Sequence, residues 1–205
     1  MSEQSTQIDG LVDFAAGLVP CIVQDWTSGE VLMLAYMNSQ ALAATRETGE
    51  MHFYSRSRER LWRKGETSGN VLRLRSLRID CDGDALLALV DACGPACHTG
   101  ERTCFYRSDD DGAAFDALAR LERTVGLRNA ERPEGSYTTK LLEDPELAGA
   151  KVREEAEEVT RAVREETDER IDEESADLLY HLIVLLAGRG RTLADAGRVL
   201  DGRRA

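Results

Sequence analysis

The chain has 205 residues, of which 42% are hydrophobic, so it is long enough for one large or two small domains and too apolar to be wholly disordered. Its formal net charge of −12 disfavours nucleic-acid binding through the overall electrostatic field. No apolar run reaches the roughly 20 residues of a membrane helix. Residues 1–10 lack the basic and apolar segments of a secretory signal, so we expect a cytoplasmic protein.

Two domains are predicted, residues 1–110 and 111–205, because the composition changes near residue 108. All five cysteines and both tryptophans lie in the first part, whereas the acidic excess is concentrated in the second. Residues 108–112 form a polar run of like charge that ends in glycine, which is typical of a linker.

The first part is predicted to be a strand-rich α+β domain. Short apolar runs at 21–23 and 31–36 flank a hairpin-like turn. Asn38 can cap a helix over 40–48, which Gly49 would end. Further strands are expected at 51–55, 71–79, 85–90 and 103–107, with a β-bulge near Ser76. Together these strands would form one sheet of six or seven strands.

The second part is predicted to be all α-helical. Helices are expected at 113–125, 140–142, 148–166, 172–187 and 193–200. Asp144-Pro145 and the glycines of 188–190 separate them. On the helix at 148–166, an apolar stripe is expected that consists of Val152, Ala156, Val159 and Val163.

Three aspartates alternate with Cys81 and Gly83 in the segment 80–84. If this segment is extended, Asp80, Asp82 and Asp84 share one face at a spacing of about 7 Å, and Cys81 points the other way. Such carboxylates repel one another, and a hard divalent cation such as Mg²⁺ would relieve the repulsion. The alternative is a solvated acidic turn, which Gly83 would suit.

Four of the cysteines fall within residues 81–104 without a CxxC pair, which disfavours a zinc ribbon or finger. The thiols of Cys81, Cys97 and Cys104 suit a zinc ion with an open position for water, whose pKa zinc lowers towards ~7. His98, beside Cys97, is a ligand, a proton carrier or a bystander. Cys21 lies in an apolar run and is expected to be a small buried residue, and Cys93 is left undecided.

A basic cluster occupies residues 56–78, where eight cations face only Glu59 and Glu66. Hydroxyl side chains and glycines are interspersed with them, a composition that fits phosphate binding. One alternative is the polar face of a strand pair, which would explain Arg73 and Arg75 without any ligand. The other is RNA binding.

These motifs resemble phosphoribosyl-AMP cyclohydrolase of histidine biosynthesis over roughly residues 11–107. The likeness rests on residues 55–58 (SRSR), 61–69 (LWRKGETSG), 80–84 (DCDGD) and 96–100 (ACHTG). It implies hydrolytic opening of the adenine ring of phosphoribosyl-AMP, with Mg²⁺ on Asp80, Asp82 and Asp84. It also implies zinc on Cys81, Cys97 and Cys104, with Cys81 reaching the zinc of a partner subunit. His98 is the candidate catalytic residue, and the candidate substrate-binding residues are Arg56, Arg58, Trp62, Arg63, Lys64, Glu66, Thr67 and Ser68.

Two predicted helices of the second part each carry a pair of carboxylates. Glu155 and Glu158 lie on one side of the helix at 148–166, and Glu174 and Asp177 share a stripe with His181 on the helix at 172–187. If buried together, these side chains would need cations, and Mg²⁺ would also hold a pyrophosphate. The alternative is a solvated face with i,i+4 ion pairs.

The second part resembles phosphoribosyl-ATP pyrophosphatase, an all-α nucleotide pyrophosphohydrolase, over roughly residues 115–200. The likeness rests on residues 132–142 (RPEGSYTTKLL), 151–159 and 173–187. It implies Mg²⁺ on Glu155, Glu158, Glu174 and Asp177, with Lys140 and Lys151 as candidate substrate-binding residues.

Together, the two resemblances indicate a homodimeric bifunctional hydrolase of histidine biosynthesis without nucleic-acid or membrane partners. Its second part would convert phosphoribosyl-ATP to phosphoribosyl-AMP and pyrophosphate, and its first part would open the adenine ring of that product. The alternative is a zinc-stabilised RNA-binding module fused to a house-cleaning nucleotide pyrophosphatase.

Overall fold

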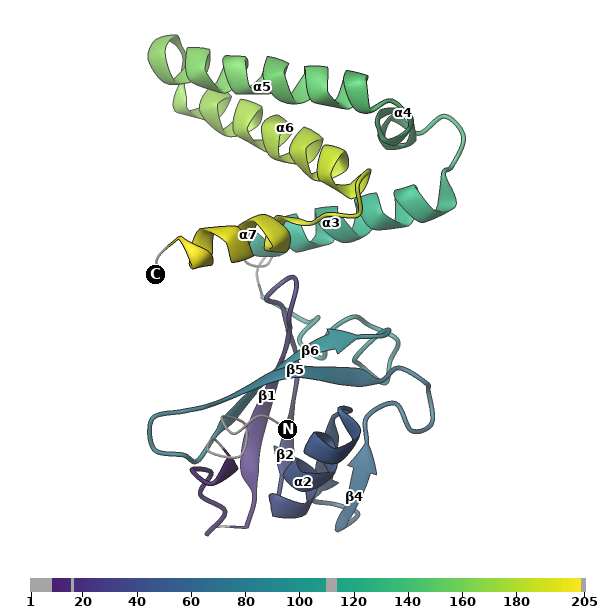
Figure 1. Cartoon of the computed structure of the whole chain (residues 1–205), viewed down its shortest axis with the longest axis vertical. Coiled ribbons are helices and arrows are strands. Elements are labelled where there is room, and N and C mark those ends of the chain that lie inside the picture. Colours follow the sequence, from purple (N-terminus) through teal and green to yellow (C-terminus); the bar gives the residue numbers. More distant parts are fainter. Residues whose placement is uncertain (1–8, 16, 110–113, 204–205) are drawn as a thin grey trace. The chain divides into compact units, whose positions relative to one another are not determined.

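The computed structural model describes residues 9–15, 17–109 and 114–203, which belong to two units, Met1–Gly112 and Ala113–Ala205 (Figure 1). Most of the predicted linker at 108–112 lies outside the described residues. Each unit has its own cluster of buried hydrophobic side chains, so each is described by itself. No helix in the described ranges has both the length and the apolar character needed to cross a bilayer.

Unit 1 contains a four-stranded sheet in the order β2-β1-β6-β5 and a separate two-stranded sheet of β3 and β4. The strands are β1 (Val19–Asp25), β2 (Val31–Met37), β3 (His52–Ser55), β4 (Arg60–Arg63), β5 (Leu72–Ile79) and β6 (Leu86–Ala92). In the larger sheet, β1 pairs antiparallel with β2 and parallel with β6, and β5 pairs antiparallel with β6. The pairing of β1 with β6 therefore brings together segments that are far apart in the sequence.

The hairpin and the helix predicted near the start of unit 1 are confirmed. Alternate residues of β1 are buried, as expected for a strand with one face against a core. The helix α2 (Ser39–Thr48) begins after Asn38, whose side chain accepts a hydrogen bond from the backbone N–H of Ala41. It ends at Gly49, which has a φ of 71°, a left-handed conformation that glycine adopts without strain.

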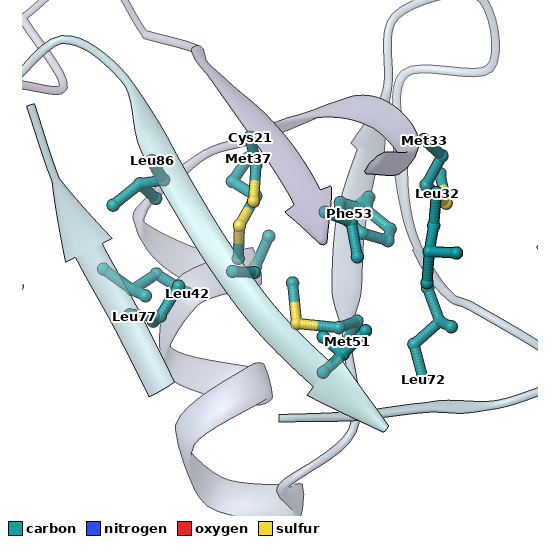
Figure 2. Packing of buried hydrophobic residues seen from close by; sticks show 14 of the residues in the cluster. Cys21, Leu32, Met33, Met37, Leu42, Met51, Phe53, Leu72, Leu77 and Leu86 are labelled. Carbon is teal, nitrogen blue, oxygen red and sulfur yellow. The ribbon is translucent and has the colours of Figure 1, made fainter. Parts of the chain in front are cut away.

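The core of unit 1 lies between the four-stranded sheet, α2 and β3 (Figure 2). Among its fully buried side chains are Leu32, Met37, Met51, Phe53 and Leu72. Burial of a side chain of this size contributes about 1.5–3 kcal/mol to the stability of the fold. This core holds the β3–β4 hairpin in place, and the residues around that hairpin form the site described below.

The β-bulge predicted in β5 is confirmed, because the pairing of β5 with β6 shifts register between Leu74 and Ser76. As a result, Leu72 and Leu77 are both buried although they are an odd number of residues apart. The single sheet of six or seven strands is wrong, since β3 and β4 form a sheet of their own.

The strand predicted at 103–107 is also wrong. Hydrogen bonds from two residues tie this loop to β2. The backbone N–H of Cys104 donates to the carbonyl oxygen of Leu32 at 2.8 Å, and the hydroxyl of Thr103 donates to that of Val31. Phe105 is 58% exposed, so the apolar side chains that suggested a strand have no core to face.

Unit 2 is all α-helical. Its helices are α3 (Ala114–Glu131), α4 (Tyr137–Glu143), α5 (Pro145–Glu165), α6 (Asp168–Ala187) and α7 (Leu193–Gly202). Each predicted helix is present, although α4 is longer than expected and α6 begins four residues earlier, after Thr167, whose side chain caps it. The long helices α5 and α6 lie side by side (Figure 1).

The apolar stripe predicted on α5 is only partly confirmed, because Val152, Ala156 and Val159 are half-buried and Val163 is exposed. Val163 is 62% exposed, and the buried residues of α5 are Ala148, Glu155 and Ala162. These three follow one another at seven-residue intervals, about two helical turns, and therefore lie on one face. The valines were the most apolar residues available, but the close-packed face of α5 is formed by small side chains and a glutamate.

Candidate active sites

A cavity of about 1120 Å³ lies in unit 1 beside β2 and the β3–β4 hairpin. It brings together the predicted substrate-binding residues of this unit, which are Arg56, Arg58, Trp62, Arg63, Lys64, Glu66, Thr67 and Ser68. Cys97 and His98 line it as well, so the basic residues and a candidate zinc ligand share one space. Tyr36 and Asn70 also line it and were not predicted, because nothing in the sequence around them marks them as residues of a site.

Several contacts hold the cavity wall in shape. The rings of Phe53 and Trp62 pack with their centroids 5.2 Å apart, and the guanidinium of Arg56 lies 3.8 Å from the centre of the Tyr36 ring. Gly65 has a φ of 86°, and a Cβ atom there would come within 2.6 Å of the backbone of Asn70. Only glycine therefore fits at this turn of the basic segment.

The remaining cations of the basic cluster lie elsewhere. Arg73, Arg75 and Arg78 are exposed on β5, where Arg75 forms an ion pair with Asp91. None of them is among the residues that line the described cavity. Their position favours the simpler interpretation, that β5 has a polar face.

Cys97 and Cys104 come together in unit 1, close enough for each thiol to affect the pKa of the other. The hydroxyl of Thr99 donates a hydrogen bond of 3.0 Å to Cys97 Sγ and is the main cause that lowers the pKa of this thiol. Burial raises the pKa of Cys104 and lowers that of the neighbouring ammonium of Lys64, which is only 8% exposed. Two neighbouring thiols, of which that of Cys97 lines the cavity, suit a soft metal such as zinc.

The structure does not bring Cys81 to this pair. Cys81 is exposed on the turn after β5, with its thiol 4.0 Å from a carboxylate oxygen of Asp82. Over the described residues, no three cysteines converge on one point. Cys21 is fully buried, as predicted, and burial raises its pKa to about 12, whereas Cys93 is exposed.

The carboxylates of Asp80, Asp82 and Asp84 are exposed and offer oxygens within 4.8 Å of one another. The extended conformation considered for this segment is wrong, because the chain turns at Gly83, which has a φ of 82°. The backbone N–H of Ala85 lowers the pKa of Asp80, whereas a hydrogen bond with Asp80 and the charge of Asp82 raise the pKa of Asp84. Such a set of crowded oxygens suits a hard divalent cation.

In unit 2, Glu155, Glu158 and Glu174 offer carboxylate oxygens within 4.8 Å of one another. Glu155 is 6% exposed and Glu174 is 3% exposed. Burial raises the pKa of Glu155, and the nearby charges of Asp177 and Glu158 raise it further. Asp177 itself is exposed and lies outside the group of three. Because buried carboxylates are costly without cations, this group also fits a divalent metal ion.

Cationic and polar side chains surround these carboxylates. Lys151 Nζ lies 4.0 Å from Glu155 Oε1, and Arg161 and Arg170 form ion pairs with Glu158 and Glu174. The helical spacing of these pairs could have predicted them.

His181 has two neighbours near this carboxylate group. Its Nδ1 lies 3.5 Å from Glu155 Oε1, and its Nε2 lies 3.3 Å from the hydroxyl of Tyr137. The contact with Tyr137 joins α4 to α6, so no local pattern could have predicted it. Lys140, the other predicted substrate-binding residue here, is exposed and lines a second cavity, formed by residues of the α3–α4 loop and α4.

Comparison with known proteins separates the two units in the same way. Residues 33–106 match the family model of phosphoribosyl-AMP cyclohydrolase, and residues 118–204 match that of phosphoribosyl-ATP pyrophosphohydrolase. The histidine biosynthesis bifunctional protein HisIE of Bacillus subtilis is 50% identical over 191 residues, which are 91% of each chain.

The HisIE of Xanthomonas axonopodis pv. citri is 50% identical over 91% of this chain and 89% of its own. That of Oceanobacillus iheyensis is 44% identical over 98% and 94%. Both family models favour the two-enzyme interpretation over an RNA-binding module. The chain therefore belongs to the HisIE family of bifunctional histidine-biosynthesis enzymes, with a phosphoribosyl-AMP cyclohydrolase domain followed by a phosphoribosyl-ATP pyrophosphohydrolase domain.

Proposed function

We propose that Glu155, Glu158, Glu174 and Asp177, in the domain at 111–205, hold the Mg²⁺ ions with which phosphoribosyl-ATP is hydrolysed to phosphoribosyl-AMP and pyrophosphate. The observation that carries this proposal is the group of three glutamates, of which Glu155 and Glu174 are buried. Bound Mg²⁺ would neutralise the negative charge of the phosphates.

The neighbouring side chains have separate tasks. Lys151, beside Glu155 and Glu154, faces the site with a positive charge that suits a phosphate oxygen. Arg161 and Arg170 hold Glu158 and Glu174 in place through ion pairs from the outer side. His181 donates from Nδ1 to the carbonyl oxygen of Asp177 at 2.9 Å, so its Nε2 is free to accept from Tyr137.

The domain at 1–110 is proposed to open the adenine ring of phosphoribosyl-AMP in the cavity of unit 1. The arginines of this cavity and the hydroxyls of Thr67 and Ser68 would bind the phosphates, and the flat ring of Trp62 lines the same wall. The adenine would then lie towards Cys97 and His98. Zinc on Cys97, Cys104 and Cys81 would supply a water of lowered pKa, and Mg²⁺ would be held by Asp80, Asp82 and Asp84.

The reaction places one demand on the protein besides binding. The phosphoribosyl group on the ring nitrogen makes the adjacent carbon, which bears the amine, electron-poor. Water adds to this carbon, and the bond between the carbon and the substituted nitrogen breaks. That nitrogen must gain a proton, and the proposal assigns its transfer to His98, which lies on the cavity wall beside Cys97.

The position of Cys81 supports a homodimer in which each zinc site is shared. Within one chain, Cys97 and Cys104 are together and Cys81 is elsewhere on an exposed turn. A third thiolate from a partner subunit would complete the set of ligands. The prediction is that inactive Cys81→Ser and Cys97→Ser subunits regain ring opening when mixed, because a mixed dimer contains one intact site. A mixture that stays inactive after subunit exchange would contradict the shared site.

Both halves of the proposed function are tested by assaying the two reactions separately in two variants, with metal analysis of each protein. Cys97→Ser should eliminate ring opening alone and lower the zinc content. Glu155→Gln should eliminate pyrophosphate release alone. The losses should exceed the ~100-fold that removal of an outer-shell partner costs. If either substitution in a folded protein eliminated both activities, two independent sites would be excluded.

A further inference from the structure

The cavity of unit 2 lined by residues of the α3–α4 loop and α4 has a volume of about 560 Å³. Tyr137 lines this cavity, and its hydroxyl contacts His181, which in turn contacts Glu155. Tyr137 also lies close enough to Lys151 to affect the pKa of that ammonium group. Tyr137 and His181 therefore connect the cavity to the carboxylate group.

The charges in this cavity are mixed. Arg132 is held by Asn129 and lies 4.0 Å from Glu143, and Glu134 also lines the cavity. Lys140 also lines the cavity and forms no ion pair with the described residues. A free ammonium suits a phosphate, whereas carboxylates accept hydrogen bonds from sugar hydroxyls. The combination suits a sugar phosphate better than a bare phosphate or a base.

Two further observations point to a ligand. Thr139 is only 7% exposed, lines the cavity, and has a hydroxyl oxygen that is buried without a hydrogen-bond partner in the described part of the chain. Buried polar atoms are rarely left unpaired unless something else satisfies them. In addition, Arg132 has a φ of 49°, a left-handed conformation that side-chain-bearing residues rarely adopt and that tends to occur at functional sites.

The substrate of the proposed function has two charged ends. Its triphosphate is assigned to the carboxylate group, which leaves the phosphoribosyl group on the adenine without a partner. We propose that the cavity lined by Arg132, Tyr137, Thr139 and Lys140 binds this phosphoribosyl group and so distinguishes phosphoribosyl-ATP from ATP. This inference rests on the proposed function and names the part of the site that sets its substrate choice.

The test compares the pyrophosphate-releasing reaction of the full-length protein, its Lys140→Gln variant, and Arg120→Gln as a control. Arg120 is exposed on α3 outside the cavity, so the control removes the same charge from the same unit. Lys140→Gln should raise the KM for phosphoribosyl-ATP about tenfold, the effect of one charged hydrogen bond, with kcat changed less than about twofold. The control should leave both constants unchanged.

Two competitive inhibitors report on the two ends of the substrate. ATP carries only the triphosphate end, so Lys140→Gln should leave its inhibition constant unchanged. Ribose 5-phosphate carries only the other end and should inhibit the unsubstituted protein competitively but bind the variant about tenfold more weakly. If Lys140→Gln weakened ATP and phosphoribosyl-ATP equally, the cavity would bind the shared part of the two nucleotides, and the proposal would be overturned.

A second variant separates binding from folding. Thr139→Val keeps the shape of the side chain and removes the unpaired hydroxyl, so the melting temperature of unit 2 should rise while the KM for phosphoribosyl-ATP rises severalfold. An unchanged KM in both variants would overturn the proposal. Failure of the proposed function itself would look different, since the unsubstituted protein would then not hydrolyse phosphoribosyl-ATP or Glu155→Gln would retain that activity.

Discussion

The two units assemble their candidate metal ligands in opposite ways. In unit 2, the carboxylates come from two adjacent helices, two of them are nearly fully buried, and basic side chains hold them from outside. In unit 1, the three aspartates lie exposed on a single turn, and the thiols are divided between a pair on one loop and Cys81 on another.

This difference shows which part of each site depends on the rest of the fold. The carboxylate group of unit 2 depends on the packing of α5 against α6, because its members come from both helices. The burial of Glu155 in this group raises the pKa of its carboxyl. The thiol pair of unit 1 needs the loop at 97–104 to be fixed against β1 and β2.

Metal removal should give the largest effect and should separate the two units. After treatment with a chelator, both activities should fall to background. Oxygen ligands bind Mg²⁺ weakly and thiolates bind zinc tightly, so pyrophosphate release should return with Mg²⁺ alone, whereas ring opening should also require zinc. Full recovery of ring opening with Mg²⁺ alone would contradict the thiolate site. The measurement is an assay of each half-reaction before and after each metal is added.

The ion pair between Arg102 and Asp25 should be the main support of the thiol loop. Arg102 Nη2 lies 2.7 Å from Asp25 Oδ2, and Asp25 is only 8% exposed. Arg102→Gln should lower the free energy of unfolding of unit 1 by about 1–3 kcal/mol, because it removes the charged partner of a buried carboxylate, whose Oδ1 keeps its hydrogen bonds from Thr27 and Ser28. Arg75→Gln, which breaks a more exposed pair with Asp91, should change it by less than about 0.5 kcal/mol.

Tryptophan fluorescence can follow this change in unit 1 alone, because both tryptophans of the chain lie in that unit. Denaturant curves would be recorded with the metal removed, so that lost zinc binding does not contribute. Equal effects of the two arginine substitutions would show that burial of Asp25 does not matter.

A smaller effect is expected from Thr99, whose hydroxyl donates to Cys97 Sγ. Thr99→Val removes this hydrogen bond and should weaken zinc binding about tenfold, as loss of an outer-shell partner does. Thr48→Val, which removes a hydroxyl from the exposed end of α2, is the matched control. Competition with a coloured chelator gives the zinc affinity of each variant, and an unchanged affinity for Thr99→Val would show that Cys97 needs no such support.

Local sequence patterns predicted the parts of the fold that local physics controls. Asn38 and Gly49 set the ends of α2, and the slip in alternation along β5 predicted a bulge that the pairing with β6 confirms. The helical spacing also put Glu174 and His181 on one stripe, and both are buried, although Asp177 of the same stripe is exposed. Each of these features depends on neighbours within a few residues in the chain.

The incorrect or missing predictions concern features that depend on contacts between segments far apart in the sequence. The loop at 103–107 has strand-like residues and meets β2, an edge strand of the larger sheet. Among the described residues, only Thr103 and Cys104 of this loop bond to β2, so it stays a loop. Val163 has the right period for a core position, yet the buried residues of α5, Ala148, Glu155 and Ala162, lie to one side of the predicted stripe. The contact of Tyr137 with His181 joins residues 44 positions apart and has no signal in the local pattern.

The smallest expected effect concerns the pH dependence of unit 2 without metal. Burial raises the pKa of Glu155 above its ordinary value of 4.5, so the native state holds a proton that the unfolded chain has already released. Between 4.5 and the raised native pKa, the native state binds more protons, and the stability of metal-free unit 2 should fall as the pH rises through this window. Below the window, Glu155 is protonated in both the native and the unfolded state, so it no longer makes the stability depend on pH.

Glu155→Gln should remove this part of the slope, whereas Glu157→Gln, an exposed neighbour on the same helix, should keep it. Far-UV circular dichroism in denaturant follows unit 2, where most of the helices lie. Added Mg²⁺ should offset the loss of stability at neutral pH in the unsubstituted protein and not in Glu155→Gln, because bound cations favour the ionised carboxylates. If the stability of both variants depended on pH with the same slope, the buried carboxyl of Glu155 would not be the group that titrates. The carboxylates of unit 2 would then not differ from the exposed aspartates of unit 1 in this respect.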